Sequence, residues 1–334
     1  MKALVFDRFG EPAEVLQLKD VALPEPGPGQ VRVRMLASPI NPSDLLVVRG
    51  RYGRLPTLPA TPGFEGVGVI DAAGPGFLRL LRGLKPGRRV AVLNGSGGNW
   101  QEFVVLPARQ VVPVSSDLPD EQVAMFFVNP ATALIMTQAV LKVEPGQWLL
   151  QTAAAGALGR IVIRLGQHFG YRTINVVRRA EQAEQLRRQG AEYVIASAQE
   201  LITDKVRSLT GGAGVQYALD AVGGSMGKAA VESLGAGGRM LVYGTLSDEP
   251  MALDPRVLMV GQKSIAGFWL SEWTRQQSIL GMLKLFRQVQ QLMRQGVLTS
   301  EVSSTHVLAD YQRALTQAEA LGKTGKVVLR MASQ

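Results

Sequence analysis

The sequence predicts an α/β protein with two domains, one barrel-like and rich in strands, the other a doubly wound parallel sheet. Three observations predict this fold class. Short strand patterns interrupted by proline and glycine fill the first third of the chain. From Gln147 onward, strand and helix patterns alternate, which is typical of a parallel sheet. At 334 residues the chain is also too long for one ordinary domain.

Short apolar runs predict the strands of the first domain. Pro24, Pro26 and Pro28 interrupt them, and Lys85-Pro86-Gly87 predicts a turn. The runs favour a compact barrel-like domain. The expected strands cover residues 4–6, 31–35, 67–70, 89–93 and 103–106.

The pattern changes near Pro119, where helical spacing begins. A final strand at 326–331 is expected to rejoin the first domain. Between these points the sequence predicts helices over 121–127, 131–141, 180–188, 226–234 and 278–293. It predicts strands beginning at Trp148, Thr173 and Tyr193 and covering 217–220 and 240–243.

Residues 148–179 have the strand–turn–helix–strand order of a dinucleotide-binding unit. Small side chains at the turn, Ala153 to Gly159, would let a pyrophosphate approach the backbone, and the helix N-terminus would attract the anion. The pattern is A-x-x-G-x-x-G and not the full G-x-G-x-x-G, so a plain strand-to-helix turn is the alternative. The predicted cofactor contacts in the turn are Ala155, Gly156, Ala157 and Leu158.

Arg178 and Arg179 follow the second strand of this unit, and Arg178 lies 19 positions after Gly159. An acidic residue near this spacing would bind the ribose 2′-hydroxyl of NAD. Guanidinium groups instead pair with phosphate, so the two arginines predict NADP, or NADPH, as the cofactor. The alternative is that both are solvated surface charges.

Cysteine is absent and histidine is limited to His168 and His306. This composition excludes disulfides and thiolate metal sites, and no metal is expected. We expect His168 to cap helix carbonyls and His306 to lie at the surface of a strand entry.

The net charge of +9 comes from scattered basic residues without interleaved aromatic residues, so no nucleic-acid partner is expected. A basic surface suits acidic ligands such as NADPH, coenzyme A esters and acyl carrier protein, or it simply aids solubility. No run of 18 apolar residues is present, so no membrane partner is expected. The chain begins directly in a strand pattern, which predicts no signal or transit peptide and a cytoplasmic protein.

Five short segments, spread over nearly the whole chain, carry a resemblance to a known family. They are residues 41–44 (NPSD), 62–66 (PGFEG), 153–159, 220–224 (DAVGG) and 325–328 (GKVV). The chain resembles the medium-chain dehydrogenase/reductase superfamily. The resemblance implies a GroES-like β-barrel catalytic domain, formed by residues 1–120 and 269–334, around a central Rossmann NADP-binding domain at 121–268.

The zinc-dependent branch of the superfamily does not fit. Its enzymes bind zinc through cysteine and histidine, whereas Phe64 stands where a zinc-ligand histidine would precede Glu65. Other segments resemble the 2-enoyl thioester reductases of the mitochondrial type and, next, the quinone oxidoreductases. These segments are 128–133 (VNPATA), 173–178 (TINVVR), 267–271 (GFWLS), and 41–44 followed by 49–53 (RGRYG).

The first resemblance implies NADPH-dependent reduction of the C=C bond of an enoyl-CoA or enoyl-ACP, with hydride transfer to Cβ and protonation of Cα. The alternative is an NADPH:quinone oxidoreductase or a reductase of small enones. A third hypothesis, from another functional class, is a nucleotide-binding protein with a structural or RNA-binding role. The absence of clustered positive charge disfavours it. A homodimer is a further expectation from the family.

The resemblance also implies roles for individual residues. Tyr52 matches the proposed proton donor of the enoyl reductases. Asn41 would orient the nicotinamide or brace the catalytic loop, with simple turn chemistry as the alternative. Lys326 would reach the cofactor, unless it is an exposed lysine before a strand. Phe268 and Trp269 would line the nicotinamide and acyl pocket, or belong to a buried edge strand between Rossmann domains. Asn129 and Thr132 are further predicted cofactor contacts. Tyr243 and Gly244 are predicted contacts for a different reason, because they follow the carboxyl end of a strand, where doubly wound sheets bind ligands.

Overall fold

The computed structural model describes residues 1–76, 83–320, 322 and 324–331. The chain divides into two compact units. Unit 1 contains residues 1–128, 286–294 and 299–334, and unit 2 contains residues 129–285 and 295–298. Among the helices that the structure describes, none has the length and apolar character needed to cross a lipid bilayer.

Unit 1 is built mainly on antiparallel strand pairs, and only β14 and β15, among the described strands, pair in parallel. In its larger sheet the order is β14-β15-β3-β4-β5-β7, with β6 paired to β3, and β1 pairs separately with β2. Its core contains Leu4, Phe6, Met35, Ile70 and Trp100. The strands are β1 (Lys2–Val5), β2 (Gln17–Asp20), β3 (Gln30–Pro39), β4 (Glu65–Ala73), β5 (Arg89–Leu93), β6 (Phe103–Pro107), β7 (Val111–Pro113), β14 (Val302–Val307) and β15 (Lys326–Arg330).

Strands β3 and β4 approach closely because β4 carries glycine on one face. A Cβ added at Gly68 would lie 2.5 Å from the carbonyl oxygen of Arg34. The last strand, β15, pairs antiparallel with β3, so the expectation that the chain end rejoins the first domain is confirmed. The short helices of this unit are α1 (Pro12–Val15), α2 (Pro42–Val48), η1 (Ala108–Gln110), α4 (Asp120–Ala124), η3 (Leu308–Asp310) and α13 (Tyr311–Glu319).

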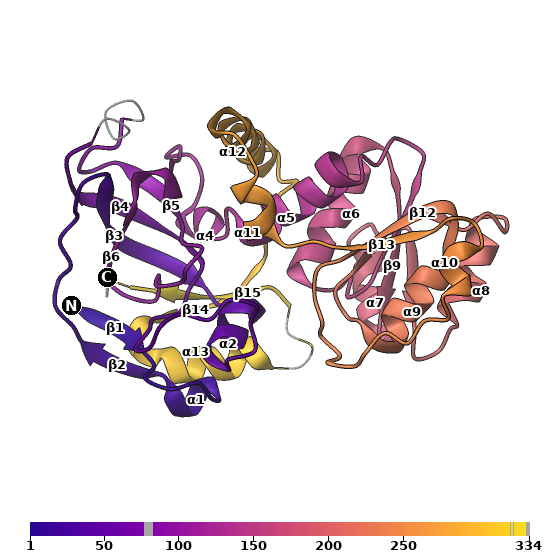
Figure 1. Cartoon of the computed structure of the whole chain (residues 1–334), viewed down its shortest axis with the longest axis horizontal. Coiled ribbons are helices and arrows are strands. Elements are labelled where there is room, and N and C mark those ends of the chain that lie inside the picture. The colour runs from indigo at the N-terminus through magenta and orange to yellow at the C-terminus, as the bar shows by residue number, and fades with distance from the viewer. Residues whose placement is uncertain (77–82, 321, 323, 332–334) are drawn as a thin grey trace. The chain divides into compact units, whose positions relative to one another are not determined.

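Unit 2 is a Rossmann fold. Its sheet has the order β10-β9-β8-β11-β12-β13 with all pairs parallel, and helices pack around it (Figure 1). The chain starts at β8, runs outward to β10, and then crosses back to β11 on the other side of β8. The strands are β8 (Trp148–Gln151), β9 (Arg172–Val177), β10 (Tyr193–Ala196), β11 (Val215–Asp220), β12 (Leu234–Val242) and β13 (Ser264–Gly267).

The helices of unit 2 alternate with these strands. Thr137 interrupts one of them, since its hydroxyl donates to the carbonyl of Ala133 over 2.8 Å and competes with the backbone. The helix expected over 131–141 is therefore α5 (Val128–Leu134) followed by a π-helical segment, η2 (Ile135–Val140). The others are α6 (Ala157–Phe169), α7 (Ala180–Arg188), α8 (Ile202–Leu209), α9 (Gly224–Glu232), α10 (Arg256–Met259) and α11 (Leu270–Arg275).

The boundaries between the units differ from the expected 120/121 and 268/269. Helix α4 packs against β3, β4 and β5, so unit 1 continues to Val128. The last long helix, α12 (Ile279–Arg294), is divided between the units. Phe286 on α12 packs on Phe126 and Phe127, with ring centroids 6.1 Å apart in each pair, which places the second half of α12 in unit 1.

Candidate active site

The carboxyl ends of the strands of unit 2 all meet at one edge of the sheet because every strand pair is parallel. This edge is where doubly wound sheets bind ligands, next to the point where the strand order reverses. Here that point lies between β8 and β11. The structure gathers at this edge the segments 152–159, 178–179, 220–224, 243–244 and 268–269, which contain most of the predicted cofactor contacts.

Backbone geometry explains the small residues of the turn after β8. Ala153 has a φ of +50°, in the left-handed region, where larger side chains are disfavoured. A Cβ added at Gly159 would lie 2.5 Å from the carbonyl oxygen of Ala154. Gly156 precedes α6, so the unpaired N–H groups of the first helical turn begin here. The four predicted cofactor contacts of this turn, Ala155, Gly156, Ala157 and Leu158, are all at least partly exposed.

A buried carboxylate joins the ends of β8 and β11 beneath this turn. Asp220 accepts hydrogen bonds at Oδ1 from the Thr152 hydroxyl (2.6 Å) and the Val222 N–H (3.1 Å), and at Oδ2 from the Gly223 N–H (2.9 Å). The Thr152 hydroxyl in turn accepts from the Ala221 N–H (2.9 Å). The two loops at the strand-order reversal are therefore held by one network.

The two predicted phosphate ligands lie on the same edge. Arg178 and Arg179 are exposed at the end of β9, and the Arg179 N–H donates to Gln182 Oε1 (3.1 Å) at the start of α7. Within the described part of the chain neither guanidinium forms an ion pair, whereas Arg188 on α7 pairs with Glu184 at 3.5 Å. Both side chains are therefore accessible from solvent.

Tyr243 and Gly244 follow β12 at this edge. The Tyr243 N–H donates to the Asp220 carbonyl (2.8 Å), and a Cβ added at Gly244 would lie 2.9 Å from the Ala221 carbonyl oxygen. Burial raises the pKa of the Tyr243 hydroxyl far above its ordinary value, and the charge of Asp220 raises it further. Tyr243 therefore offers a neutral hydroxyl.

Phe268 and Trp269 follow β13, whose edge is open. The Phe268 N–H donates to the Val242 carbonyl (2.8 Å), and both aromatic residues are half-buried. Ser264, Ala266 and Gly267 of β13 are exposed in the single chain, so the alternative of an edge strand buried between two Rossmann domains stays a prediction.

Asn129 and Thr132 both lie on α5. Asn129 is half-buried and Thr132 is 7% exposed. The Asn129 Nδ2 is a sheltered donor without a hydrogen-bond partner among the described residues.

A second polar cluster lies inside unit 1, and it contains Asn41 and Lys326. The Asn41 Nδ2 donates to Glu65 Oε1 (3.0 Å), and the Lys326 ammonium donates to Asn41 Oδ1. Glu65 Oε2 accepts the N–H groups of Phe127 (2.9 Å) and Val128 (2.8 Å). Lys326 is only 6% exposed, so the alternative of an exposed lysine does not describe it. Asn41 is 1% exposed and stands at the N-cap of α2, which agrees with the alternative of turn chemistry as well as with a bracing role.

Asp44 adds a second buried carboxyl group to this cluster. It accepts the Asn41 N–H (2.7 Å) at the start of α2 and the Phe64 N–H (3.0 Å) at the start of β4. Burial raises the pKa of Asp44 to about 7, and the nearby Glu65 adds to the rise. Burial also raises the pKa of Glu65, against the lowering effect of its hydrogen bonds.

Tyr52 lies in the segment after α2 and is half-buried. Its ring packs on Phe64 with centroids 5.3 Å apart and a tilt of 41°. The chain reaches this position through Gly50, whose φ of +70° an L side chain rarely adopts. Phe64 thus supplies the surface that fixes the Tyr52 ring.

Comparisons with known proteins agree with this geometry. Residues 27–116 match a family model described as an alcohol dehydrogenase GroES-like domain, and residues 157–288 match one described as a zinc-binding dehydrogenase. The human mitochondrial enoyl-[acyl-carrier-protein] reductase is 34% identical over 99% of this chain and 89% of its own length. The chain belongs to the medium-chain dehydrogenase/reductase superfamily.

Other members of the superfamily show the same likeness. The Arabidopsis thaliana mitochondrial enoyl-[acyl-carrier-protein] reductase is 32% identical over 97% of this chain and 86% of its own. A Bacillus thuringiensis protein described as an NADPH:quinone reductase has a TM-score of 0.92 at 33% identity, covering 98% of both chains. A mycobacterial protein solved in complex with NADPH has a TM-score of 0.88 at 30% identity, covering 99% of this chain and all of its own.

The residues of this superfamily member do not fit a zinc site. Cysteine is absent from the sequence, Phe64 precedes Glu65 where a zinc-ligand histidine would stand, and the side chain that donates to Glu65 Oε1 is the amide of Asn41. No group of three acidic, histidine or cysteine side chains among the described residues could hold a metal ion. His306 Nε2 contacts Ser304 Oγ (3.2 Å) and Gln317 Oε1 (2.9 Å), and the His168 ring packs edge-on against Phe169. The chain belongs to the zinc-independent branch.

Sequence reasoning missed the roles of Glu65 and Asp220. Both residues lie in segments that carry the family resemblance, 62–66 and 220–224, but the sequence predicted no hydrogen-bond partner for either side chain. A carboxylate next to an apolar strand run, as in Glu65-Gly66-Val67 and Leu219-Asp220, is the available signal, because a buried charge requires partners. Its partners lie too far along the chain for the sequence to identify.

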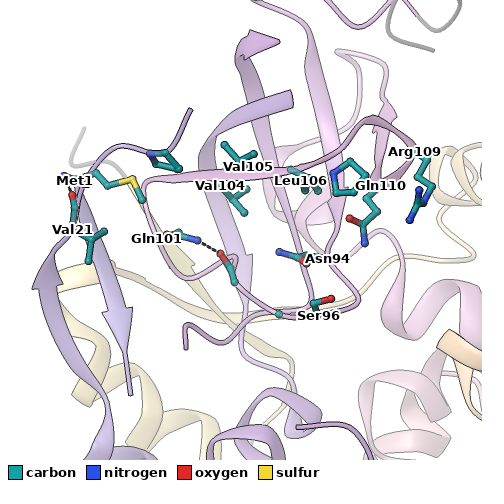
Figure 2. A pocket seen from close by; sticks show the side chains of 15 residues that line it. Met1, Val21, Asn94, Ser96, Gln101, Val104, Val105, Leu106, Arg109 and Gln110 are labelled. Atoms are coloured by element: carbon teal, nitrogen blue, oxygen red, sulfur yellow. Dashed lines mark hydrogen bonds between the residues drawn. The ribbon is translucent and has the colours of Figure 1, made fainter. Parts of the chain in front are cut away.

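A hollow of about 590 Å³ opens elsewhere on unit 1 (Figure 2). Its lining includes Met1, Val21, Asn94 and Arg109, and Gln101 donates to the Gly98 carbonyl (2.5 Å) at its wall. None of the predicted site residues lines it.

Proposed function

We propose that this protein catalyses the NADPH-dependent reduction of the C=C bond of 2-enoyl thioesters, either enoyl-CoA or enoyl-ACP. The observation that carries the proposal is the likeness, along 99% of the chain, to the human enoyl-[acyl-carrier-protein] reductase at 34% identity. The half-buried Tyr52, fixed on Phe64, supports it, because reduction of an enoyl thioester requires a proton as well as a hydride.

The residues of unit 2 fit NADP. The small residues of the turn and the first N–H groups of α6 would receive the pyrophosphate. Arg178 and Arg179 would bind the 2′-phosphate, as guanidinium groups do. When bound, NADPH supplies the hydride that adds to Cβ of the substrate. The proposed contacts to the rest of the cofactor are Asn129, Thr132, Tyr243, Gly244, Phe268, Trp269 and Lys326.

Tyr52 is the proposed general acid. Addition at Cβ leaves negative charge on Cα and the thioester oxygen, and a positioned tyrosine hydroxyl can deliver its proton to Cα. Packing on Phe64 holds the ring in one orientation, which favours such a transfer. Asn41 is a positioning residue in this proposal, because both ends of its amide are engaged inside unit 1 and brace the start of α2.

A second function, the reduction of quinones or small enones, is favoured by a different observation. The Bacillus thuringiensis protein described as an NADPH:quinone reductase has a TM-score of 0.92 at 33% identity. A 2-haloacrylate reductase has a TM-score of 0.87 at 27% identity. A quinone accepts its proton from solvent, so Tyr52 would be dispensable for that reaction.

The proposal includes two partners. An acyl carrier protein is acidic, and the net charge of +9 would attract it at long range. A second copy of the chain would pair with the open edge of β13, the outer strand of the unit 2 sheet, where Ser264, Ala266 and Gly267 are exposed.

The deciding experiment compares the loss of NADPH absorbance with crotonyl-CoA, a longer 2-enoyl-CoA and a quinone. The proposal expects rapid turnover of the thioesters and little turnover of the quinone. Turnover of the quinone alone would assign the second function instead.

A further inference from the structure

Two fully buried amides face each other beneath the dinucleotide turn. Gln151 is the last residue of β8, and Asn175 is its partner in register on β9. The Gln151 Nε2 donates to Asn175 Oδ1 over 2.7 Å, and both residues have no exposed surface. Strands buried in a parallel sheet are usually valine, isoleucine and leucine, so this polar pair is exceptional.

The orientation of both amides is determined by their neighbours. The Asn175 Nδ2 donates to Thr173 Oγ1 (3.0 Å) and to the Tyr193 carbonyl (3.0 Å). These bonds require the Asn175 oxygen to face Gln151, and Gln151 must therefore present its nitrogen. A flipped Gln151 amide would bring two oxygens together, so the pair has one arrangement.

Gln151 connects this arrangement to the turn. Its Nε2 also donates to the Gly159 carbonyl over 2.9 Å, within the first turn of α6. Gly159 lies so close to Ala154 that an added Cβ would be 2.5 Å from the Ala154 carbonyl oxygen. Ala154 in turn donates its N–H to the Val176 carbonyl on β9 over 3.1 Å. The first turn of the helix is thus attached to both β8 and β9.

We propose that Gln151 and Asn175 are positioning residues that fix the first N–H groups of α6 for the pyrophosphate of the dinucleotide. This inference rests on the proposed NADP site. Burying two amides costs more free energy than burying two apolar side chains. The hydrogen bonds of the pair offset this cost, and the same bonds hold the turn in one geometry. The pair contacts neither the 2′-phosphate arginines nor Tyr52.

The test uses a double variant, Gln151→Leu with Asn175→Val, which replaces both partners by apolar residues. Removing both amides leaves neither of them unpaired, and the groups that lose a donor are the carbonyls of Gly159 and Tyr193 and the Thr173 side chain. The dissociation constants of NADPH, NADH and adenosine 2′-monophosphate are measured by calorimetry, together with the thermal midpoint. Ser233→Ala is the matched control, since Ser233 is also buried in unit 2 and its hydroxyl donates to the Ala229 carbonyl (2.7 Å).

We expect the double variant to keep its fold and to bind NADPH and NADH about tenfold more weakly, equally for both because both contain a pyrophosphate. Adenosine 2′-monophosphate, which has no pyrophosphate, should bind unchanged, and Ser233→Ala should bind all three like the parent. Unchanged NADPH binding in the folded double variant would overturn the inference. A parallel loss of adenosine 2′-monophosphate binding would also overturn it, by showing a general structural defect.

The parent protein separates this inference from the proposed function. A parent that binds NADPH without reducing any enoyl thioester contradicts the proposed substrate and leaves the positioning test unchanged. A parent that binds NADPH and turns over the thioester, with a double variant of equal affinity, contradicts only the role of Gln151 and Asn175.

Discussion

The Asn41 side-chain nitrogen donates to Glu65 Oε1 over 3.0 Å at the centre of a buried polar chain. The Lys326 ammonium precedes Asn41 in this chain, and the N–H groups of Phe127 and Val128 follow Glu65. This series of hydrogen bonds therefore joins four segments that are distant in the sequence. Each member satisfies a neighbour that water cannot reach, so the loss of one leaves another unpaired.

Glu65→Gln tests this chain. Glutamine keeps the size of the side chain but replaces one acceptor oxygen by an NH₂ donor. The variant side chain can therefore no longer accept hydrogen bonds from Asn41 and from both backbone N–H groups at the same time. We expect the free energy of unfolding to fall by about 1–3 kcal/mol, measured by urea denaturation. Glu14→Gln, at an exposed position on α1, is the control and should leave the midpoint unchanged. Equal midpoints for both variants would contradict the structural role of Glu65.

Asp44 predicts a pH dependence of stability. Its pKa is about 7 in the folded protein against 3.8 for the free group, so between these values the folded state binds more protons than the unfolded state. The contribution of Asp44 to stability is therefore fully present at low pH and is lost as the pH rises from about 4 to about 7. A shift of this size corresponds to at most about 4 kcal/mol.

Asp44→Asn removes this titration. We expect the free energy of unfolding of the variant to fall less steeply between pH 4 and about pH 7 than that of the parent. Glu65, whose pKa is also raised by burial, leaves a residual slope in both proteins. The measurement is urea denaturation at a series of pH values, and identical slopes would show that Asp44 is not the titrating group.

Local patterns in the sequence were sufficient for many strands of the sheets, although β2 and β7 were not among the expected ones. The strand at 89–93 and the helix at 180–188 have the expected bounds, because each has a clear apolar period and flanking turn residues. The short helix α2 was not predicted, since its seven residues include Pro42 and Ser43 and carry little helical signal. Helix α13 was also missed, although its apolar face packs on β14 and β15.

In the candidate site, too, features set by local spacing were predictable and features set by non-local contacts were not. The turn at 153–159 between a strand and a helix, and the place of Arg178 directly after a strand, could be predicted from local spacing, whereas the roles of these residues in cofactor binding stay predictions. The Asn41–Glu65–Lys326 chain was not, since its members are 24 and 285 residues from Asn41 and meet only through strand pairing. The packing of Tyr52 on Phe64 depends on the same non-local pairing.

Tyr52→Phe tests the proton donor. The phenyl ring preserves packing on Phe64 and removes only the hydroxyl, so we expect kcat for an enoyl thioester to fall by about 100-fold or more while the NADPH dissociation constant stays unchanged. Tyr311→Phe is the control, since that hydroxyl donates to the Leu16 carbonyl (3.0 Å) in the same unit. Comparable turnover of Tyr52→Phe and the parent would remove Tyr52 from the mechanism.

Arg178→Ala tests the cofactor preference. Arg178 is exposed at the carboxyl end of β9, where its guanidinium can pair with a 2′-phosphate that NADPH carries and NADH lacks. We expect the parent to bind NADPH much more tightly than NADH, and the variant to lose about ten- to 100-fold in NADPH affinity with NADH affinity unchanged, measured by calorimetric titration. Salt should weaken NADPH binding to the parent more than to the variant, because the lost contact is an ion pair. Arg188→Ala, which removes a guanidinium already paired with Glu184, should keep the parental preference. Equal affinity of the parent for NADPH and NADH would show that Arg178 and Arg179 are surface charges without a phosphate to bind.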